Sequence, residues 1–389
     1  MVSCTVILLL SLQIGFGGEF GLRHRIPEAV LKNYLQRAVT HAGLLASSSD
    51  PSTETFADDL KMLENIGAKF VGRAAFVWEL SPDDDRHFNQ VKARAAQAHA
   101  TLPDLILQAA IFEIVTRDVE KIAIPAWVFE GLDLPVENRS FDYEAMLYDK
   151  GKFHNHWREG ASVPDMGRTE TRLWFYYRAV RYLESGVEAL HFGQVELMDD
   201  ADPSHRHWID LLSRIRKFAA LHSRRNLVLC DAHTHGISEN GKLLFDFHSY
   251  PMRLREKPGE AMKTFLSDES RGDIYRHSLG GISPSGWTCE SLPYLVEFDN
   301  YGYSGRGGQS VGGIWVWGYD EISWFAHQPR EYRESWLREA HAWVKNHPSP
   351  GALQLATRRI LAAPVGGSFM FHARDFGLEP LYRDLLTGR

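Results

Sequence analysis

The sequence predicts an α/β fold, specifically a (β/α)8 barrel of the TIM type. Short apolar runs alternate with longer amphipathic ones along the 389 residues, and several of the short runs are apolar throughout. A strand of that composition is buried on both faces, which is typical of a parallel sheet covered by helices. Eight such strands separated by helical segments favour a closed barrel over the alternative, an open doubly wound sheet. No glycine-rich turn joins a strand to a helix near the start of the chain, which also disfavours the open sheet.

The predicted strands are apolar runs bounded by polar or turn-forming residues. They cover residues 69–78, 104–114, 189–197, 226–233, 243–248, 294–299, 313–318 and 368–372. The run 243–248 has a second interpretation as the returning strand of a hairpin, because residues 236–242 are too few to form a helix. The count of eight strands therefore depends on that run.

The helices expected between these strands show apolar residues at helical spacing and recognisable ends. Asp83 and Asp84 are candidate caps for a helix over 84–100, and Gly186 ends a helix over 169–185. Two further helices are predicted, one within 203–225 and one over 332–346.

Residues 19–389 are predicted to form one barrel domain with a large insertion. The insertion, around 117–168, contains many prolines and aromatic residues, which indicates a loop over one end of the barrel; a strand around 122–128 is the alternative. Residues 1–18 form a possible signal segment, because the apolar run 6–14 resembles the core of a secretory signal. We therefore expect a secreted or periplasmic protein, with a cytoplasmic protein as the alternative. No run is long enough to span a membrane.

The composition is that of a globular chain, with 44% hydrophobic and 24% charged residues. The net charge of -7 lacks the basic footprint of a nucleic-acid binder, so no nucleic-acid partner is expected. The three cysteines have no metal-binding spacing, which disfavours a structural zinc site. We expect no cofactor and no metal.

Ionisable residues stand at the carboxyl ends of several predicted strands. Alternate residues of a strand share a face, so Asp231, His233 and His235 lie together after apolar residues on the same face. A buried unpaired charge is costly, so such groups must converge and pair. In barrel enzymes the carboxyl ends of the strands hold the active site, and we expect one there. The same change from apolar to polar occurs at Arg73, Glu196, Asp246, His248, Glu297 and Asp299.

Glu196 and Glu297 suit the hydrolysis of a glycosidic bond, which needs two carboxyl groups roughly 5–10 Å apart. Aromatic rings that stack on sugars accompany them, and Trp315 and Trp317 alternate along one predicted strand and so share a face. The sequence therefore predicts a glycoside hydrolase with a carbohydrate substrate. The predicted sugar-binding residues are Arg73, Asp231, His233, His235, His248, Asp299, Trp315 and Trp317.

The layout over residues 69–318 resembles that of the (β/α)8-barrel glycoside hydrolases, in particular the clan of retaining enzymes with two catalytic glutamates. The resemblance implies that Glu196 is the acid/base at the end of strand four and Glu297 the nucleophile at the end of strand seven. It also implies that Arg73 and one of the two tryptophans, Trp315 or Trp317, line the pocket.

The sequence departs from the clan's pattern in two respects. Val195 precedes Glu196 where the clan usually has asparagine, and the strand numbering needs one more strand before Glu196 than the sequence shows. Asp231 or Asp299 is therefore an alternative to either glutamate.

Two other functions stay open. The motif Asp231-Ala-His233-Thr-His235 resembles the first-strand signature of metal-dependent hydrolases, because an HxH pair on a strand directs two imidazoles to one side. In that family the motif opens the barrel, whereas 225 residues precede the strand here. The other function is a catalytically inactive carbohydrate-binding barrel. Further ligands for the metal alternative are His191, Asp246, His248 and His372.

Overall fold

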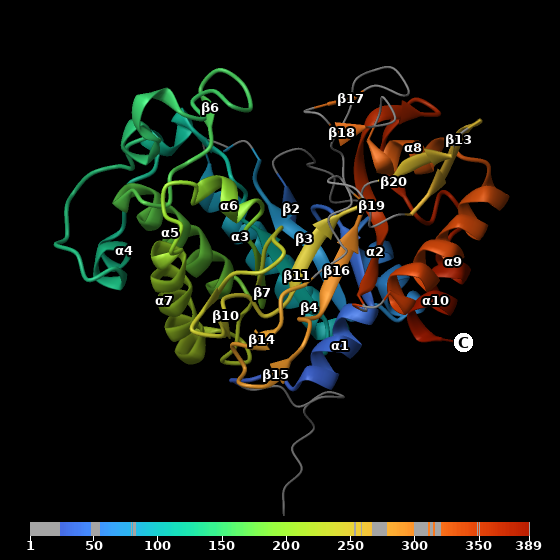
Figure 1. Ribbon diagram of the computed structural model, residues 1–389. Coiled ribbons are helices and arrows are strands. Elements are labelled where there is room, and N and C mark those ends of the chain that lie inside the picture. Colours follow the sequence, from blue (N-terminus) through green and yellow to red (C-terminus); the bar gives the residue numbers. More distant parts are fainter. Residues whose placement is uncertain are drawn as a thin grey trace, which may run out of the picture.

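Eight parallel strands form a barrel in which each strand pairs with the next one along the chain (Figure 1). The last strand pairs in parallel with the first, and a single bridge between His233 and Ser249 joins the fifth strand to the sixth. The predicted (β/α)8 barrel is therefore confirmed. Its strands are β1 (Ala38–His41), β3 (Phe70–Phe76), β4 (Ile106–Ala110), β7 (Ala189–His191), β8 (Leu229–Asp231), β11 (His248–Pro251), β16 (Tyr294–Glu297) and β19 (Ala352–Val365). The structure, a computed structural model, describes residues 24–47, 55–78, 80, 83–252, 254–257, 259–266, 278–298, 310–311, 314–315, 320–347, 349 and 351–388.

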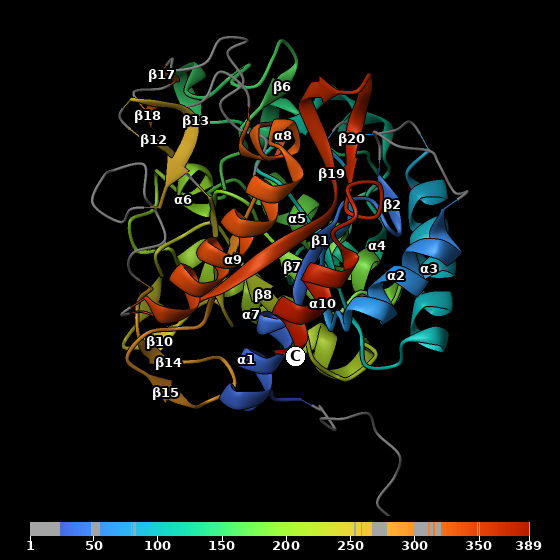
Figure 2. The same cartoon turned by 90° about the vertical axis from the view of Figure 1, so that its right-hand side faces the viewer.

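Two barrel strands differ from those that the sequence predicted. The sequence analysis missed β1 and β19, because β1 has only four residues and β19 carries Arg358 and Arg359 within its apolar run. The predicted strand 368–372 exists as β20 (Ser368–His372), but it pairs antiparallel with β19 outside the barrel (Figure 2). Of the predicted strand 313–318, only β18 (Ile314–Trp315) is described, in a two-stranded pair with β17 (Ser310–Val311).

The ambiguous run 243–248 contributes almost nothing to the barrel. Its first residue ends β10 (Lys242–Leu243), and its last residue, His248, begins β11. The hairpin interpretation is correct for its beginning, because β10 pairs antiparallel with β9 (Ser238–Glu239). The described elements between β11 and β16 are four short strands. They are β12 (Arg255–Lys257), β13 (Glu260–Phe265), β14 (Gly281–Ile282) and β15 (Thr288–Cys289).

The predicted helices over 84–100, 169–185, 203–225 and 332–346 are all confirmed, and they cover the barrel from outside (Figures 1 and 2). Asp83 is the cap of its helix, since its side chain accepts a hydrogen bond from the backbone N–H of Arg86. The helices are α2 (Phe56–Ile66), α3 (Asp84–Thr101), α5 (Thr169–Glu184), α6 (Val195–Met198), α7 (Arg206–His222), α8 (Glu321–His327), α9 (Arg330–Asn346) and α10 (Glu379–Thr387). Among the described helices, none is long and apolar enough to cross a membrane.

The segment around 117–168 contains short helices and turns, and it adds no strand to the barrel. The alternative of a strand over 122–128 is wrong, because α4 (Ala126–Gly131) begins within it and packs on α5. Trp127 stacks on Tyr177 of α5, with ring centroids 5.9 Å apart. The other elements here are β5 (Val115–Thr116), η1 (Arg117–Lys121), η2 (Glu144–Met146), η3 (Asp149–Gly151) and β6 (Ala161–Ser162). The possible signal segment, residues 1–18, lies outside the described residues and stays a prediction.

The amino-terminal end of the barrel is closed by an apolar layer and by helix α1 (Glu28–Gln36), which lies beneath the strands in Figure 1. Leu31, Tyr34 and Leu35 of α1 pack against this layer, and all three are buried. Each barrel strand contributes one inward residue to this layer, which we call the barrel floor. For the sixth strand, β11, that residue is Phe247, which immediately precedes the strand. The layer consists of Ala38, Phe70, Ile106, Ala189, Leu229, Phe247, Leu295 and Ala352.

Replacing Leu31 by alanine is expected to lower the free energy of unfolding by about 2–5 kcal/mol, because it leaves a cavity between α1 and the barrel floor. Leu221→Ala is the control, since that leucine is 74% exposed, and its change is expected to stay within about 0.5 kcal/mol. Urea unfolding followed by circular dichroism measures both. Equal stability of the two variants would show that α1 does not close the barrel.

Candidate active site at the carboxyl end of the barrel

Two residues beyond the apolar layer of the barrel floor, the interior of the barrel becomes polar. Two residues after each member of the floor, seven strands place a buried polar side chain inside the barrel, and β3 places Gly72 there. A Cβ atom at Gly72 would lie 2.1 Å from Nε2 of Gln354, so this level is filled by side chains from the other strands. The polar residues are Thr40, Gln108, His191, Asp231, Ser249, Glu297 and Gln354.

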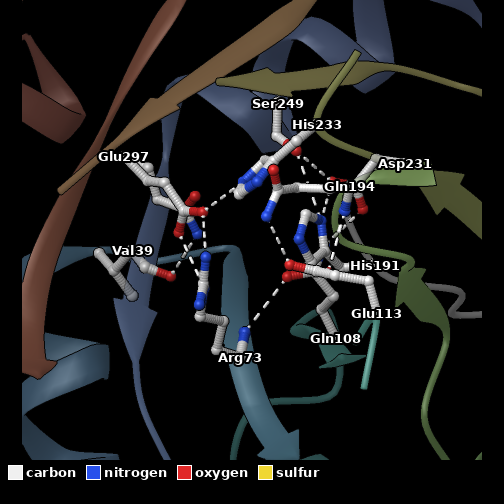
Figure 3. Close-up of polar contacts among 11 residues, drawn as sticks. Val39, Arg73, Gln108, Glu113, His191, Gln194, Asp231, His233, Ser249 and Glu297 are labelled. Carbon is white, nitrogen blue, oxygen red and sulfur yellow. Dashed lines mark hydrogen bonds and ion pairs between the residues drawn. The ribbon is translucent and has the colours of Figure 1, made fainter. Parts of the chain in front are cut away.

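Glu297, the last residue of β16, is held by a cation and an imidazole (Figure 3). Arg73 donates from Nε to Oε2 at 3.1 Å and from Nη2 to Oε1 at 2.5 Å, and His233 donates from Nε2 to Oε1 at 3.0 Å. Burial opposes ionisation of Glu297, but the guanidinium and the imidazole outweigh it and hold the pKa of this carboxyl well below its ordinary value. Burial also lowers the pKa of His233. The pair is therefore an ionised carboxylate beside a neutral imidazole.

Arg73 reaches Glu297 from a distorted strand. Its backbone has φ 54°, in the left-handed region, and the register of β3 against β4 shifts between Val71 and Ala75. Such a bulge re-aims a side chain, and its strain is compensated by the contacts that it permits. The N–H of Arg73 donates to Oε1 of Gln108 at 3.2 Å, and the guanidinium carbon lies 5.2 Å from the ring centroid of Phe112.

Asp231, at the end of β8, accepts three hydrogen bonds from within the polar level (Figure 3). Gln108 donates to one oxygen at 2.6 Å, and Ser249 and Nδ1 of His191 donate to the other, both at 2.8 Å. The other ring nitrogen of His191, Nε2, is buried and has no hydrogen-bond partner among the described residues. The ring of His191 lies 4.7 Å from that of His233, so the two imidazoles connect the Asp231 and Glu297 groups.

A third carboxylate, Glu113, fixes the loop after β7. It accepts hydrogen bonds from the backbone N–H of Gln194 at 3.0 Å and from the side-chain amide of Gln194 at 2.8 Å. Gly193 between β7 and Gln194 has φ 60°, and a Cβ atom there would lie 1.8 Å from Oε2 of Glu113. Only glycine allows the carboxylate this close approach to the loop.

Aromatic side chains form one wall beside these groups. Trp78 contacts Phe112 and Trp157, with ring centroids 5.4 and 5.1 Å apart, and Phe112 lies 6.1 Å from His191. Trp78 and Trp157 are half-buried. The indole N–H of Trp157 donates to the carbonyl of Glu113 at 3.0 Å, which fixes the wall to the polar site.

Glu196 lies in a different environment from Glu297. It stands in the first turn of α6, its side chain is exposed, and it accepts a hydrogen bond from Thr234 at 2.7 Å. The extra strand that the numbering needed before Glu196 is β1, which the sequence analysis overlooked. With β1 included, β7 is the fourth barrel strand and β16 the seventh. Glu196 therefore follows strand four, and Glu297 ends strand seven.

The structure does not bring every predicted residue to this site. His248 and Asp246 lie on the helix-facing side of the wall, because the inward residues there are Phe247 and Ser249. His248 contacts Ser278, and Asp246 accepts from Arg216 of α7. The predicted sharing of the inward face by Asp246 and His248 is therefore wrong, since the alternation was assigned one residue out of register.

Of the other predicted residues, one is exposed and three lie wholly or partly outside the part of the chain that the structure describes. His235 is exposed, with its ring 5.3 Å from that of Tyr250, and so does not accompany His233 into the barrel. Asp299 and Trp317 lie outside the described residues, and for Trp315 only the backbone, in β18, is described.

Gln108 and Ser249 belong to the site, but sequence reasoning missed them. Both are uncharged, and each stands alone among apolar or aromatic neighbours. A signal was present, because each lies two residues after an apolar floor residue, Ile106 or Phe247.

The predicted metal motif does not form as a unit. Asp231 bonds to Gln108, Ser249 and His191, and His235 is exposed. The grouping with ligand atoms within 4.8 Å of one another is instead His191, His233 and Glu297. Both oxygens of Glu297 in this grouping already accept hydrogen bonds from Arg73.

Several solved barrels are similar to this chain in overall fold. A debranching enzyme from Nostoc punctiforme, soaked with acarbose, is 10% identical over 91% of this chain and 81% of its own, with a TM-score of 0.44. A type III pullulan hydrolase from Thermococcus kodakarensis is 11% identical over 92% and 70%, with a TM-score of 0.43. A trehalose-6-phosphate hydrolase from Bacillus licheniformis is 10% identical over 83% and 64%, with a TM-score of 0.39. No protein-family model and no curated protein matches the sequence.

Replacing Arg73 by glutamine is expected to lower the free energy of unfolding by about 3–5 kcal/mol at neutral pH, because Glu297 loses its buried cation. The pKa of Glu297 lies below its ordinary value of 4.5 in the folded protein, so its stabilising effect is present above pH 4.5 and is lost as the pH falls below it. The difference between wild type and Arg73→Gln should therefore narrow below pH 4.5. Urea unfolding across this range measures it.

Lys121→Gln is the control, because Lys121 forms an exposed ion pair with Asp118. Its effect is expected to stay below about 1 kcal/mol. A loss in Arg73→Gln as small as that of the control would contradict the assignment of Arg73 as the cation that stabilises Glu297.

Proposed function

We propose that this chain is a glycoside hydrolase that acts at the carboxyl end of the barrel. The observation that carries the proposal is the ionised, buried Glu297 at the end of strand seven, held by Arg73 and His233 beside an aromatic wall. A carboxylate kept charged within the barrel is suited to attack or stabilise an oxocarbenium-like carbon. Trp78 and Trp157, which are half-buried, offer aromatic rings on which a sugar can stack.

In this proposal, Glu297 is the nucleophile and Glu196 the general acid/base. The charge-assisted bonds from Arg73 aim the carboxylate of Glu297 and keep it deprotonated. Glu196 stands after strand four on the exposed side of the mouth, where a leaving group and then water can reach it. Its bond from Thr234 orients the carboxyl group. With these roles, the enzyme would retain the anomeric configuration.

The sugar hydroxyls are proposed to bind the polar groups around Glu297. His233 stands directly beside the nucleophile, and His235 lies at the rim, so both are placed to orient a hydroxyl. Asp231 accepts hydrogen bonds from Gln108, Ser249 and His191, so its proposed role is to fix His191. Glu297 has the Arg73 guanidinium as a partner and Asp231 has no arginine among its hydrogen-bond donors in the described residues, which makes Asp231 the weaker candidate for the nucleophile.

A metal-dependent hydrolase is the second candidate, and one observation favours it: the close grouping of His191, His233 and Glu297. The unpartnered Nε2 of His191 is a possible ligand atom. Against this candidate, Arg73 already neutralises Glu297, and a metal would have to displace it. A chelator distinguishes the two, because it abolishes metal-dependent hydrolysis and leaves a two-carboxylate enzyme unchanged.

Glu297→Gln and Glu196→Gln are each expected to lower kcat by about 10³-fold or more on the best of a panel of aryl glycosides and oligosaccharides. Glu28→Gln is the control, because Glu28 pairs with Lys32 on α1, at the opposite end of the barrel, and its kcat should match wild type. Proton NMR of the first product anomer reports whether configuration is retained.

Near-wild-type turnover in Glu297→Gln would overturn the proposed nucleophile, and the same result in Glu196→Gln would transfer the acid role to another group. Sugar binding without turnover by the wild type would identify an inactive binding barrel. Loss of activity with a chelator would favour the metal-dependent alternative.

Trp78→Ala is expected to raise KM about tenfold or more with a smaller effect on kcat, because it removes a stacking surface from the aromatic wall. Trp343→Ala is the control, since Trp343 is also half-buried but lies on α9 in the outer helical layer. Steady-state kinetics on one substrate measures both. An unchanged KM in Trp78→Ala would remove the wall from the sugar-binding site.

A further inference from the structure

A second group of metal-ligating residues lies outside the barrel interior. His41 ends β1, Asp59 stands on α2, and His372 ends β20, and all three side chains are buried. Each offers one ligand atom, and these atoms lie within 4.8 Å of one another. His41 faces the helical layer, because Ala38 and Thr40 are the inward residues of β1. The group therefore lies between the barrel wall and its cover, where no step of the proposed hydrolysis uses it.

The hydrogen bonds of Thr357 determine which nitrogen of His41 carries the proton. The hydroxyl of Thr357 donates its only hydrogen to the carbonyl of Thr40 at 3.0 Å. Its oxygen must therefore accept the 3.1 Å bond from Nδ1–H of His41. The lone pair of the neutral ring is then on Nε2, which is buried, has no hydrogen-bond partner among the described residues and faces Oδ2 of Asp59 at 3.5 Å.

Two acceptors that face each other in a dry interior are held together by a proton or by a metal ion between them. Asp59 is 3% exposed, and a buried carboxylate is costly unless hydrogen-bond donors or a cation compensate it. Its hydrogen-bond donors among the described contacts are the hydroxyl of Thr55 at 2.8 Å and Nε2 of His372 at 2.9 Å. Arg94 lies close by, but it donates to the carbonyls of Leu44 and Leu45.

Two of the three distances within the group are near those of tetrahedral coordination, and the third is at most 4.8 Å. With metal–ligand bonds of about 2.0–2.1 Å, neighbouring ligand atoms of a tetrahedral zinc ion lie about 3.3 Å apart. The 3.5 Å between Nε2 of His41 and Oδ2 of Asp59 is close to this value and longer than an ordinary hydrogen bond. For zinc to bind, the 2.9 Å between Nε2 of His372 and Asp59 needs to open by a few tenths of an ångström, and the proton on Nε2 has to be replaced by one on Nδ1, which is buried.

We propose that His41, Asp59 and His372 bind a zinc ion. Two imidazoles and one carboxylate are donors that zinc prefers, and Thr357 supplies the outer hydrogen bond that orients a ligating histidine. Three protein donors leave one coordination position for water. Because the group is enclosed between β1, α2 and β20, that water is closed off from substrate, and the ion has a structural role.

The position of the group explains what such an ion stabilises. It connects the first barrel strand, the helix that follows it and the strand after the last barrel strand, at the seam where β19 pairs with β1 (Figure 2). Chain segments more than 300 residues apart in the sequence meet there, as the contact between Asp59 and His372 shows. The cysteine spacing disfavoured a structural zinc site in the sequence analysis. The ligands proposed here are histidine and aspartate, to which that argument does not apply.

The test measures zinc in the full chain, purified without a histidine tag after dialysis against micromolar zinc. Mass spectrometry of the metal content should give one zinc per chain in wild type, and much less in Asp59→Asn and in His372→Gln. His233→Gln is the matched control, because it removes a histidine from the other three-residue group and should keep its zinc. Cobalt substitution should give the visible absorption bands of a tetrahedral site in wild type and His233→Gln.

Removing the metal with a chelator should lower Tm by about 5 °C in wild type and in His233→Gln, and leave Tm of Asp59→Asn unchanged. Thr357→Val keeps all three ligands and removes the orienting acceptor, so zinc affinity should fall about tenfold even if Asp59→Asn does not fold. Wild type without stoichiometric zinc, zinc retained in both ligand variants, or zinc lost from His233→Gln alone would each overturn the proposal.

Discussion

A carboxylate buried inside a barrel stays charged only if a cation lies beside it, and the ion pair of Arg73 and Glu297 meets that constraint here. The pair joins the second strand to the seventh across the mouth. Arg73 can reach across because its backbone adopts the left-handed conformation and because Gly72 leaves the barrel centre to Gln354 and Gln108. A distorted strand, a missing side chain and a cross-barrel ion pair are therefore parts of one arrangement, and the geometry of the candidate site depends on all three.

The residues that stabilise the barrel and the residues of the candidate site occupy two different layers of its interior. At the amino-terminal level, each strand contributes an apolar residue, and α1 covers them. Two residues further along, seven strands contribute polar groups, and four of these bond to one another, since Asp231 accepts from Gln108, Ser249 and His191. Since parallel strands all point the same way, a change from apolar to polar after two residues produces a polar layer to which every barrel strand except β3 contributes a side chain. The apolar level can therefore support the fold while the polar level is free to specialise.

This alternation explains how much could be predicted from the sequence. The fold class, the four long helices, Glu297 and the gathering of Arg73, Asp231 and His233 around the mouth follow from apolar runs that end in charged residues. Gln108 and Ser249 escaped notice because uncharged residues in such runs carry a weak signal. Asp246 and His248 were placed on the wrong face, because a one-residue error in register exchanges the two faces of a strand. The physical cause is that Asp246 has its own cation, Arg216, in the helical layer, so charge alone does not identify the inward face.

The strands that sequence reasoning missed, β1 and β19, are the two that close the barrel. Both strands carry polar residues that point toward the helical layer, including His41 and Thr357. Neither strand therefore shows the uninterrupted apolar run from which the other strands were predicted. His41 and Thr357 bond to each other, and beside them Asp59 of α2 bonds to His372 of β20, so polar contacts at this seam connect the two ends of the chain. Closing a barrel requires its first and last strands to pair over the longest sequence separation, which is entropically the most costly contact in the fold. A specific buried polar group at that seam adds directional contacts that apolar packing lacks, and these fix the register of β1 against β19.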